Sequence, residues 1–334
     1  MSIPVVDLFA GPGGLGEGFS SVRTGAGEPV FKIALSIEMD RAAHKTFELR
    51  SFFRQFPRAG VPEDYYRFLR QEISREELFA RHPAEAGSAQ EDAWNAELGK
   101  QPPADVDERI VRAIGGSPVW MLCGGPPCQA YSVMGRSRSG GIDENDHRLY
   151  LYREYLRILA VHRPTALVFE NVKGILSSKV KGSALFHPLL ADLRSPTTAF
   201  GGHRAPIRYC IYSLTVPGQA CCVDGEPLFD YRDFVIRSEE HDIPQARHRV
   251  ILLGVREDMA PLVVPTLAKK NRHVPVGRVL SGLPRLRSGV TRRKDDRRNG
   301  RGRYTKWSAV TRFQESRMAR RLAPAKRSGE PFYE

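Results

Sequence analysis

Residues 3–19 read IPVVDLFAGPGGLGEGF, and this stretch decides the fold. The apolar run 3–6 is typical of a buried strand, and the glycines after Asp7 are typical of a tight turn before a helix. Strand, glycine-rich turn and helix together let backbone N–H groups approach a cofactor closely. The glycines satisfy the spacing G-x-G-x-x-G, and Glu38 follows about where an acid would bind a ribose. The sequence therefore predicts a nucleotide-type cofactor site in an α/β fold.

A second stretch, Gly124–Ser132, reads GGPPCQAYS and follows the apolar run 119–123, which is typical of a short buried strand. Cys128 then lies between two prolines, whose φ angles are fixed, and a polar turn. A thiol held at the mouth of a strand in this way is a candidate nucleophile. Cys123 and Cys210, within apolar runs, fit core packing instead.

Two further strings come later in the chain. Residues 166–174 read ALVFENVKG, an apolar strand that ends in Glu170-Asn171-Val172. Residues 245–249 read QARHR and precede the strand-like run 250–255. The four strings, in this order, resemble the motifs of the DNA cytosine-5 methyltransferases of bacterial and phage modification systems.

The resemblance implies a Rossmann-like, doubly wound sheet with a reversed last strand, and S-adenosyl-L-methionine as the cofactor. By motif position, the cofactor-binding residues would be Phe9, Ala10, Gly11, Gly14, Leu15, Glu38, Met39, Pro127 and Leu151. Glu38 would hold the ribose hydroxyls, and Met39 would pack on the adenine. An acidic residue near the third strand would also approach the adenine, and Asp107 is the candidate.

The resemblance likewise assigns catalytic roles to Cys128, Glu170, Arg247 and Arg249. Carbon 5 of cytosine is a poor nucleophile until a thiolate, here from Cys128, adds to carbon 6. Glu170 matches the residue that protonates or hydrogen-bonds nitrogen 3, which requires a carboxyl pKa raised above about 4.3. Arg247 and Arg249 are candidates for the positive charge that favours the thiolate. The target base would be flipped out of double-stranded DNA.

Length and composition agree with a soluble enzyme. The chain has 334 residues, of which 41% are hydrophobic, enough for one large core or one domain plus a smaller one. No apolar stretch approaches the roughly 20 residues of a membrane span, and no secretory signal is evident, so a cytoplasmic location is expected. The five cysteines match no zinc-ligand spacing, and we expect no metal.

The domain organisation follows from composition and periodicity. We expect a catalytic domain over residues 1–265, with a helical insertion at about 51–117 whose middle, 83–91, is a loop. Strands and helices alternate from residue 118 onward, which favours a doubly wound sheet. The strands at 233–238 and 249–255 are expected to pair as an antiparallel hairpin. Residues 266–334 hold 20 Lys or Arg against five Asp or Glu, which favours a linker and the start of a DNA-contacting recognition region.

The Gly-Asn-containing motif with which the resembled family ends is not found here, and we expect a second polypeptide to supply it. Three alternatives stay open. The first is a tRNA cytosine-5 methyltransferase, although its Cys-Phe-Thr signature is not seen. The second is a catalytically incomplete, DNA-binding subunit of a split methyltransferase. The third is a nicotinamide enzyme built on the glycine turn. The resemblance favours a role in restriction–modification.

Overall fold

The computed structural model describes most of the chain up to residue 281 and two short segments beyond it. The described residues are 2–57, 60–126, 147–177, 179–180, 183–184, 186–200, 205–218, 229–261, 264–270, 272–281, 290–291 and 304–305. The predicted site residues Pro127 and Cys128 lie outside them. The chain forms two compact units, Met1–His241 with Ala246–Lys269, and Asp242–Gln245 with Lys270–Glu334.

The first unit is built on one eight-stranded sheet. In chain order its strands are Ile3–Leu8 (β1), Phe31–Glu38 (β2), Ala93–Asn95 (β3), Met121–Gly124 (β4), Ala166–Val172 (β5), Tyr209–Tyr212 (β8), Val235–Arg237 (β9) and His248–Arg256 (β10). Their order in space is β3-β2-β1-β4-β5-β10-β8, and β9 pairs with β10. Strands β1 to β5 pair in parallel, whereas β10 is antiparallel to β5, β8 and β9. The predicted reversed last strand and the predicted hairpin are both confirmed.

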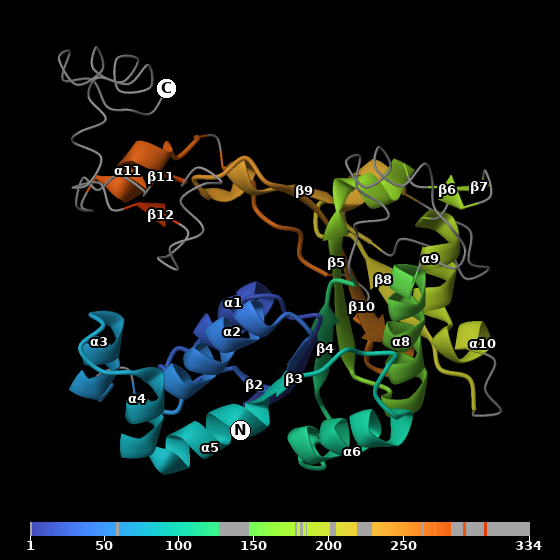
Figure 1. The fold of residues 1–334 in the computed structure, drawn as a ribbon. Helices are drawn as coiled ribbons and strands as arrows, with labels where there is room; N and C mark the ends of the chain where they lie inside the picture. Colours follow the sequence, from blue (N-terminus) through green and yellow to red (C-terminus); the bar gives the residue numbers. More distant parts are fainter. Residues whose placement is uncertain are drawn as a thin grey trace. The chain divides into compact units, whose positions relative to one another are not determined.

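Helices cover both faces of this sheet (Figure 1). The helices of this unit are Gly14–Ser21 (α1), Arg41–Arg54 (α2), Glu63–Leu69 (α3), Arg75–Arg81 (α4), Pro83–Asp92 (α5), Pro103–Ile114 (α6), His147–His162 (α8), Phe186–Arg194 (α9) and Pro196–Phe200 (α10), and not all of them contact the sheet. On one face, Ile110 of α6, Tyr155 of α8 and Leu193 of α9 are fully buried in the larger core. On the other face, Leu15 and Phe19 of α1 pack on a smaller core. The predicted doubly wound α/β fold is thus confirmed.

Residues 83–91, expected to be a loop, form helix α5 instead. The helix begins at Pro83, whose fixed φ suits a first helical position. Ala86 and Ala89 are buried in a third, smaller core that includes residues of α2 and α4. This packing outweighs the weak helix propensity of the Gly-Ser pair between the two alanines. The surrounding stretch also supplies β3 to the sheet edge and α6 to the larger core, so it is more than a helical insertion.

The apolar positions at helical spacing in this stretch divide into two groups. Ile73 and Leu78 are buried in the third core. Tyr66 and Leu69, both on α3, are instead exposed by 40% and 52%. Tyr66, Leu69 and Leu78 lie on helices, whereas Ile73 lies between α3 and α4. The helical period also did not distinguish buried positions from exposed ones.

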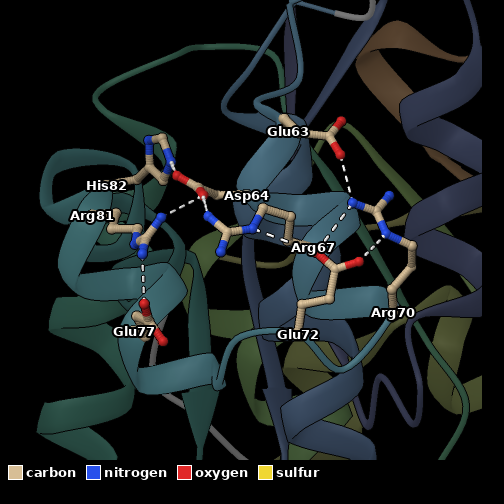
Figure 2. A network of polar contacts seen from close by, with 8 residues as sticks. All are labelled: Glu63, Asp64, Arg67, Arg70, Glu72, Glu77, Arg81 and His82. Atoms are coloured by element: carbon tan, nitrogen blue, oxygen red, sulfur yellow. Dashed lines mark hydrogen bonds and ion pairs between the residues drawn. The ribbon is translucent and has the colours of Figure 1, made fainter.

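Charged side chains join α3 to α4 on the protein surface (Figure 2). The network consists of Glu63, Asp64, Arg67, Arg70, Glu72, Glu77, Arg81 and His82. Asp64 connects the two helices, since its Oδ1 accepts from Arg81 Nη1 at 2.7 Å and its Oδ2 lies 3.4 Å from His82 Nε2. Exposed pairs of this kind contribute only about 0.2–1 kcal/mol each. They fix how α3 lies against α4, while the third core supplies most of the stability.

The remaining elements are short. In the first unit, Lys179–Val180 (β6) pairs with Ser183–Ala184 (β7), and 3-10 turns occupy Lys173–Ser177, Tyr231–Phe234, Ser238–His241 and Glu257–Met259. The described part of the second unit contains the helix Val276–Leu280 (α11) and the paired strands Val290–Thr291 (β11) and Tyr304–Thr305 (β12). Within the described residues, no helix has the length and apolarity needed to cross a membrane.

Candidate active site

The carboxyl ends of four neighbouring strands define the candidate site. Strands β1, β2, β4 and β5 run parallel, so their carboxyl ends meet at one edge of the sheet, where α/β folds bind their ligands. Phe9, Glu38, Gly125 and Glu170 lie at or near these ends. Residues far apart in the sequence therefore converge on one edge.

The glycine-rich turn after β1 has an unusual backbone. Phe9, Gly11 and Gly13 have positive φ angles of 56°, 56° and 88°. Glycine adopts this region without strain, whereas phenylalanine does so only when its surroundings hold it there. Ala10 N–H donates to the Ile37 carbonyl at 3.0 Å, which ties the turn to β2. Helix α1 begins directly afterwards, and the N–H groups of its first turn have no partner within the helix.

Glu38 fixes this turn from the neighbouring strand. Its Oε2 accepts the N–H of Gly11 at 2.8 Å, and its Oε1 accepts the N–H of Asp40 at 2.7 Å. Each carboxylate oxygen has a second lone pair, so both can still accept a ligand hydroxyl. The residue predicted to bind a ribose therefore also holds the glycine turn in shape.

A cavity of about 200 Å³ opens beside the turn. Its lining residues are Phe9, Ile37, Glu38, Met39, Ala96, Glu97, Leu98, Gly125 and Leu151. The lining is mostly apolar, and the carboxylates of Glu38 and Glu97 are its charged groups. An apolar slot with a carboxylate placed for hydroxyl groups suits a nucleoside. Four of the residues predicted to bind the cofactor, Phe9, Glu38, Met39 and Leu151, line this cavity.

The other predicted cofactor residues that the structure describes do not line it. Ala10 and Gly11 belong to the turn, and Gly14 is the first residue of α1. Leu15 packs against the smaller core on the α1 side of the sheet. The assignment of these four residues to the cofactor site stays a prediction.

One acidic residue of the cavity, Glu97, was missed by the sequence reasoning, which pointed to Asp107. Glu97 follows β3, a strand of three residues that is too short to show a periodic pattern. Asp107 lies on α6, where its Oδ1 accepts from Arg157 Nη1 at 2.8 Å and lies 2.7 Å from His162 Nε2. Asp107 therefore connects α6 to α8, and the assignment of Asp107 to the cofactor site is wrong.

Glu170 lies near the end of β5 and is paired with Arg249 of β10. Arg249 Nε is 2.8 Å from Glu170 Oε1, and the side chain of Glu170 is 27% exposed. Burial raises the pKa of Glu170, and the positive charges of Arg249 and Arg247 oppose this rise. The carboxyl is therefore easier to protonate than a solvated glutamate, as a proton donor requires. The pair Arg249–Glu170 brings together two of the four predicted catalytic residues.

Asn171, next to Glu170, connects β5 to the loop that carries Cys128. Its Nδ2 donates to the Pro126 carbonyl at 3.3 Å, and its Oδ1 accepts the Val172 N–H at 2.9 Å. The residue is 2% exposed, so both groups depend on these partners. Asn171 thereby fixes the backbone two residues before Cys128.

Two sequence matches to known proteins bear on this site. The sequence profile of the C-5 cytosine-specific DNA methylase family matches residues 88–194, a range that contains Cys128 and Glu170. The type II methyltransferase M.Bpa9945I of Bacillus paralicheniformis is 31% identical over 272 residues, which cover 76% of this chain and 54% of that protein. By these two matches the chain is similar to the C-5 cytosine-specific DNA methylase family.

Other relatives within this family are more distant. The type II methyltransferase M.DdeI of Desulfomicrobium norvegicum is 24% identical over 289 residues, covering 85% of this chain and 49% of that protein. The DNA (cytosine-5-)-methyltransferase M.ApeKI of Aeropyrum pernix is 29% identical over 181 residues, covering 53% and 35% of the two chains. The chain thus spans about half the length of the first two relatives.

Among solved structures, the chain is similar to one described as a DNA modification methyltransferase encoded within an E. coli prophage. The identity is 18%, the TM-score is 0.49, and the match covers 88% of this chain and 58% of the other. At this score the likeness adds nothing to the fold assignment, which the strand order and pairing already establish.

Gly125 packs so closely against Glu170 that position 125 of the candidate site has no room for a side chain. A Cβ on Gly125 would lie 2.6 Å from Glu170 Oε2 and 2.7 Å from the Glu170 carbonyl oxygen. The carbonyl belongs to β5 and cannot move without disturbing the sheet. We expect Gly125→Ala to destabilise the protein by about 1–3 kcal/mol and to displace the Glu170 carboxyl. Urea denaturation measures the first effect.

The matched control is Gly87→Ala within α5, where a Cβ would meet nothing within 4 Å. This substitution is expected to stabilise the protein by up to about 1 kcal/mol, because alanine favours the helix. If Gly125→Ala were as stable as the wild type, the close approach of Gly125 to Glu170 would be wrong.

Proposed function

We propose that this chain transfers a methyl group from S-adenosyl-L-methionine to carbon 5 of cytosine in double-stranded DNA through a covalent adduct with Cys128. The observation that carries the proposal is the position of Glu170. Its carboxyl, with a pKa raised by burial, lies against Gly125, three residues before Cys128. A proton donor and a nucleophile on adjacent strand ends are what addition to a cytosine ring requires.

The cofactor pocket would be the cavity beside the glycine turn. Glu38 would accept the ribose hydroxyls, and Phe9 and Met39 would pack on the adenine. The apolar lining and the turn held by Glu38 support this fit. When bound, S-adenosylmethionine supplies an electrophilic methyl group on a sulfonium. The protein's part is to hold that group beside the flipped base and to exclude water.

The chain's own residues form the covalent adduct and then release it. The Cys128 thiolate bonds to carbon 6 of the base while the Glu170 carboxyl gives its proton to nitrogen 3. Carbon 5 then takes up the methyl group. Loss of the carbon 5 proton to solvent breaks the carbon 6–sulfur bond, and nitrogen 3 returns its proton to Glu170. Arg249 holds the Glu170 carboxylate between turnovers, and Arg247 adds positive charge near it.

DNA binding would involve the basic C-terminal segment. The 20 Lys or Arg of residues 266–334 exceed the five Asp or Glu, and such an excess favours contacts to phosphates.

Covalent trapping tests the proposed chemistry. The purified chain is incubated with S-adenosylmethionine and a pool of DNA duplexes whose cytosines are all replaced by 5-fluorocytosine, which has no carbon 5 proton to lose. A protein–DNA complex that survives a denaturing gel is expected, and Cys128→Ser should abolish it. An adduct formed only with a matching RNA pool would favour the tRNA enzyme. DNA binding without an adduct in the wild type would favour a non-catalytic subunit.

A further inference from the structure

Asp7 is a fully buried carboxyl that the proposed reaction does not use. It lies on β1 in register with Ser36 of β2 and Cys123 of β4. These three residues are 1%, 3% and 0% exposed and form a polar row across three strands. Two residues further along the same segments, about 7 Å in strand length, Phe9, Glu38 and Gly125 line the cavity. The row therefore lies one layer beneath the candidate cofactor site.

The carboxyl of Asp7 also lies against the start of α1. Its Oδ2 is 3.3 Å from where a Cβ on Gly16 would stand. Among the described residues this oxygen has no hydrogen-bond partner. A buried carboxylate with an unpartnered oxygen is unstable as an anion, so the site favours the protonated form unless a positive charge comes near.

The groups around Asp7 come from five elements. Burial raises its pKa to about 7, against the effects of the Cys123 thiol, the Gly16 N–H and the charge of Arg54 on α2. The negative charge of Glu38 on β2 opposes ionisation further. Tyr155 of α8 also interacts electrostatically with Asp7, and its own pKa is raised well above the ordinary value, chiefly by burial. On α1, Glu17 is engaged by Arg54 at 2.5 Å.

Glu38 lies two residues beyond Ser36 on β2 and lines the cavity, and its negative charge acts on Asp7. By the same coupling, a positive charge that enters the cavity would favour the ionised form. The methyl donor carries such a charge on its sulfonium, whereas the thioether that remains after methyl transfer is neutral at sulfur. Donor and product thus differ in the charge at sulfur, and the protonation of a buried, poorly solvated carboxyl responds to a nearby charge.

We propose that Asp7 is a positioning residue that releases its proton to solvent when the cationic donor binds and takes up a proton when the neutral thioether remains. This inference rests on the proposed function, since it requires S-adenosylmethionine in the cavity. An ionised Asp7 then stabilises the donor complex but not the product complex. The chain thereby distinguishes donor from product by charge, in a residue that contacts neither.

Calorimetric titration tests this coupling. S-adenosylmethionine and S-adenosylhomocysteine are each titrated into the full chain in phosphate and in Tris, whose ionisation heats differ. A charge about 10 Å away in a medium of effective dielectric constant about 20 changes an equilibrium about tenfold. Near pH 7 this corresponds to release of roughly 0.4 proton with the donor and none with the product. The ratio of donor to product affinity should rise about fivefold from pH 6 to pH 8.

Two variants make the result specific. Asp7→Asn should remove both the proton release and the pH dependence of the affinity ratio. Asp92→Asn is the matched control, because Asp92 also has a pKa raised by burial but lies at the end of α5. It should behave as the wild type. Equal proton release with both ligands, or an unchanged pH dependence in Asp7→Asn, would overturn the inference.

A second measurement does not depend on any ligand or on the folding of the variants. In protein labelled with carbon-13 at the aspartate carboxyls, one resonance should titrate with a midpoint near 7. A protein whose aspartates are all ionised at pH 5 would overturn the inference. Failure of the donor to bind at any pH would overturn the proposed function, whereas donor binding without proton release would overturn this inference alone.

Discussion

Methyl transfer is expected to slow by about 10²–10⁴-fold when Glu170 is replaced by alanine, because general acid catalysis contributes about this much. Without a proton donor at nitrogen 3, the thiolate addition to carbon 6 would leave a negative charge on the ring. Glu170 is the carboxyl that lies against Gly125, at the start of the Cys128 loop. Single-turnover methylation of duplex DNA with labelled S-adenosylmethionine measures the change, in the presence of any complementing polypeptide.

One further substitution separates proton transfer to nitrogen 3 from hydrogen bonding to it. Glu170→Gln keeps a donor at the same place but cannot transfer a proton, so its rate should lie between those of the wild type and the alanine variant. The wild-type rate should fall as the pH rises through the raised pKa of Glu170, since only the protonated carboxyl can donate. Glu170→Gln should lack this fall.

Arg249 determines where that fall occurs. Its charge lowers the pKa of Glu170, so Arg249→Met should raise this pKa further and move the fall to higher pH. A Glu170→Ala variant with wild-type rates, or an unchanged pH profile in both other variants, would contradict the role given to Glu170.

The stability of the protein is expected to decrease by on the order of 4 kcal/mol between pH 4 and pH 7 through Asp7 alone. Burial raises the pKa of this carboxyl from its ordinary value of 3.8 to about 7. Between these two pH values the folded protein binds more protons than the unfolded chain. The folded state therefore loses stability as the pH rises through this window, and the loss is complete above the folded pKa.

Urea denaturation at pH 5 and pH 8 measures this effect. Asp7→Asn cannot titrate, and the difference in unfolding free energy between the two pH values should change by several kcal/mol relative to the wild type. Comparing the two pH values within each variant cancels the effect of the new amide itself. An identical pH dependence in the wild type and in Asp7→Asn would show that Asp7 is ionised in the folded protein at pH 5.

The fold was predictable because its signals are local and strong. The apolar run before Asp7 and the glycines after it predicted strand, turn and helix, and the reversed β10 followed from the QARHR string and its resemblance. Helix α5 was not predicted, because its alanines depend on packing against distant helices. Propensity alone does not include that contribution.

The candidate site was predictable where a residue type is tied to a motif. Phe9, Glu38, Met39 and Leu151 were all named from motif positions, and all line one cavity. Glu97 was missed because it follows a strand whose assignment depends on pairing with β2. The role of Asp7 beneath the site could not be derived from sequence, since its burial arises only when β2, β1 and β4 lie side by side.

The contacts made by Glu38 have a consequence for how a ligand would enter. The backbone N–H of Gly11 is anchored to the Glu38 carboxylate by a contact within the protein itself. A molecule that enters the cavity therefore meets a preorganised wall, and little conformational entropy is lost on association. The rate of association is then limited by how often the molecule meets the cavity in the correct orientation, rather than by ordering of the glycine turn.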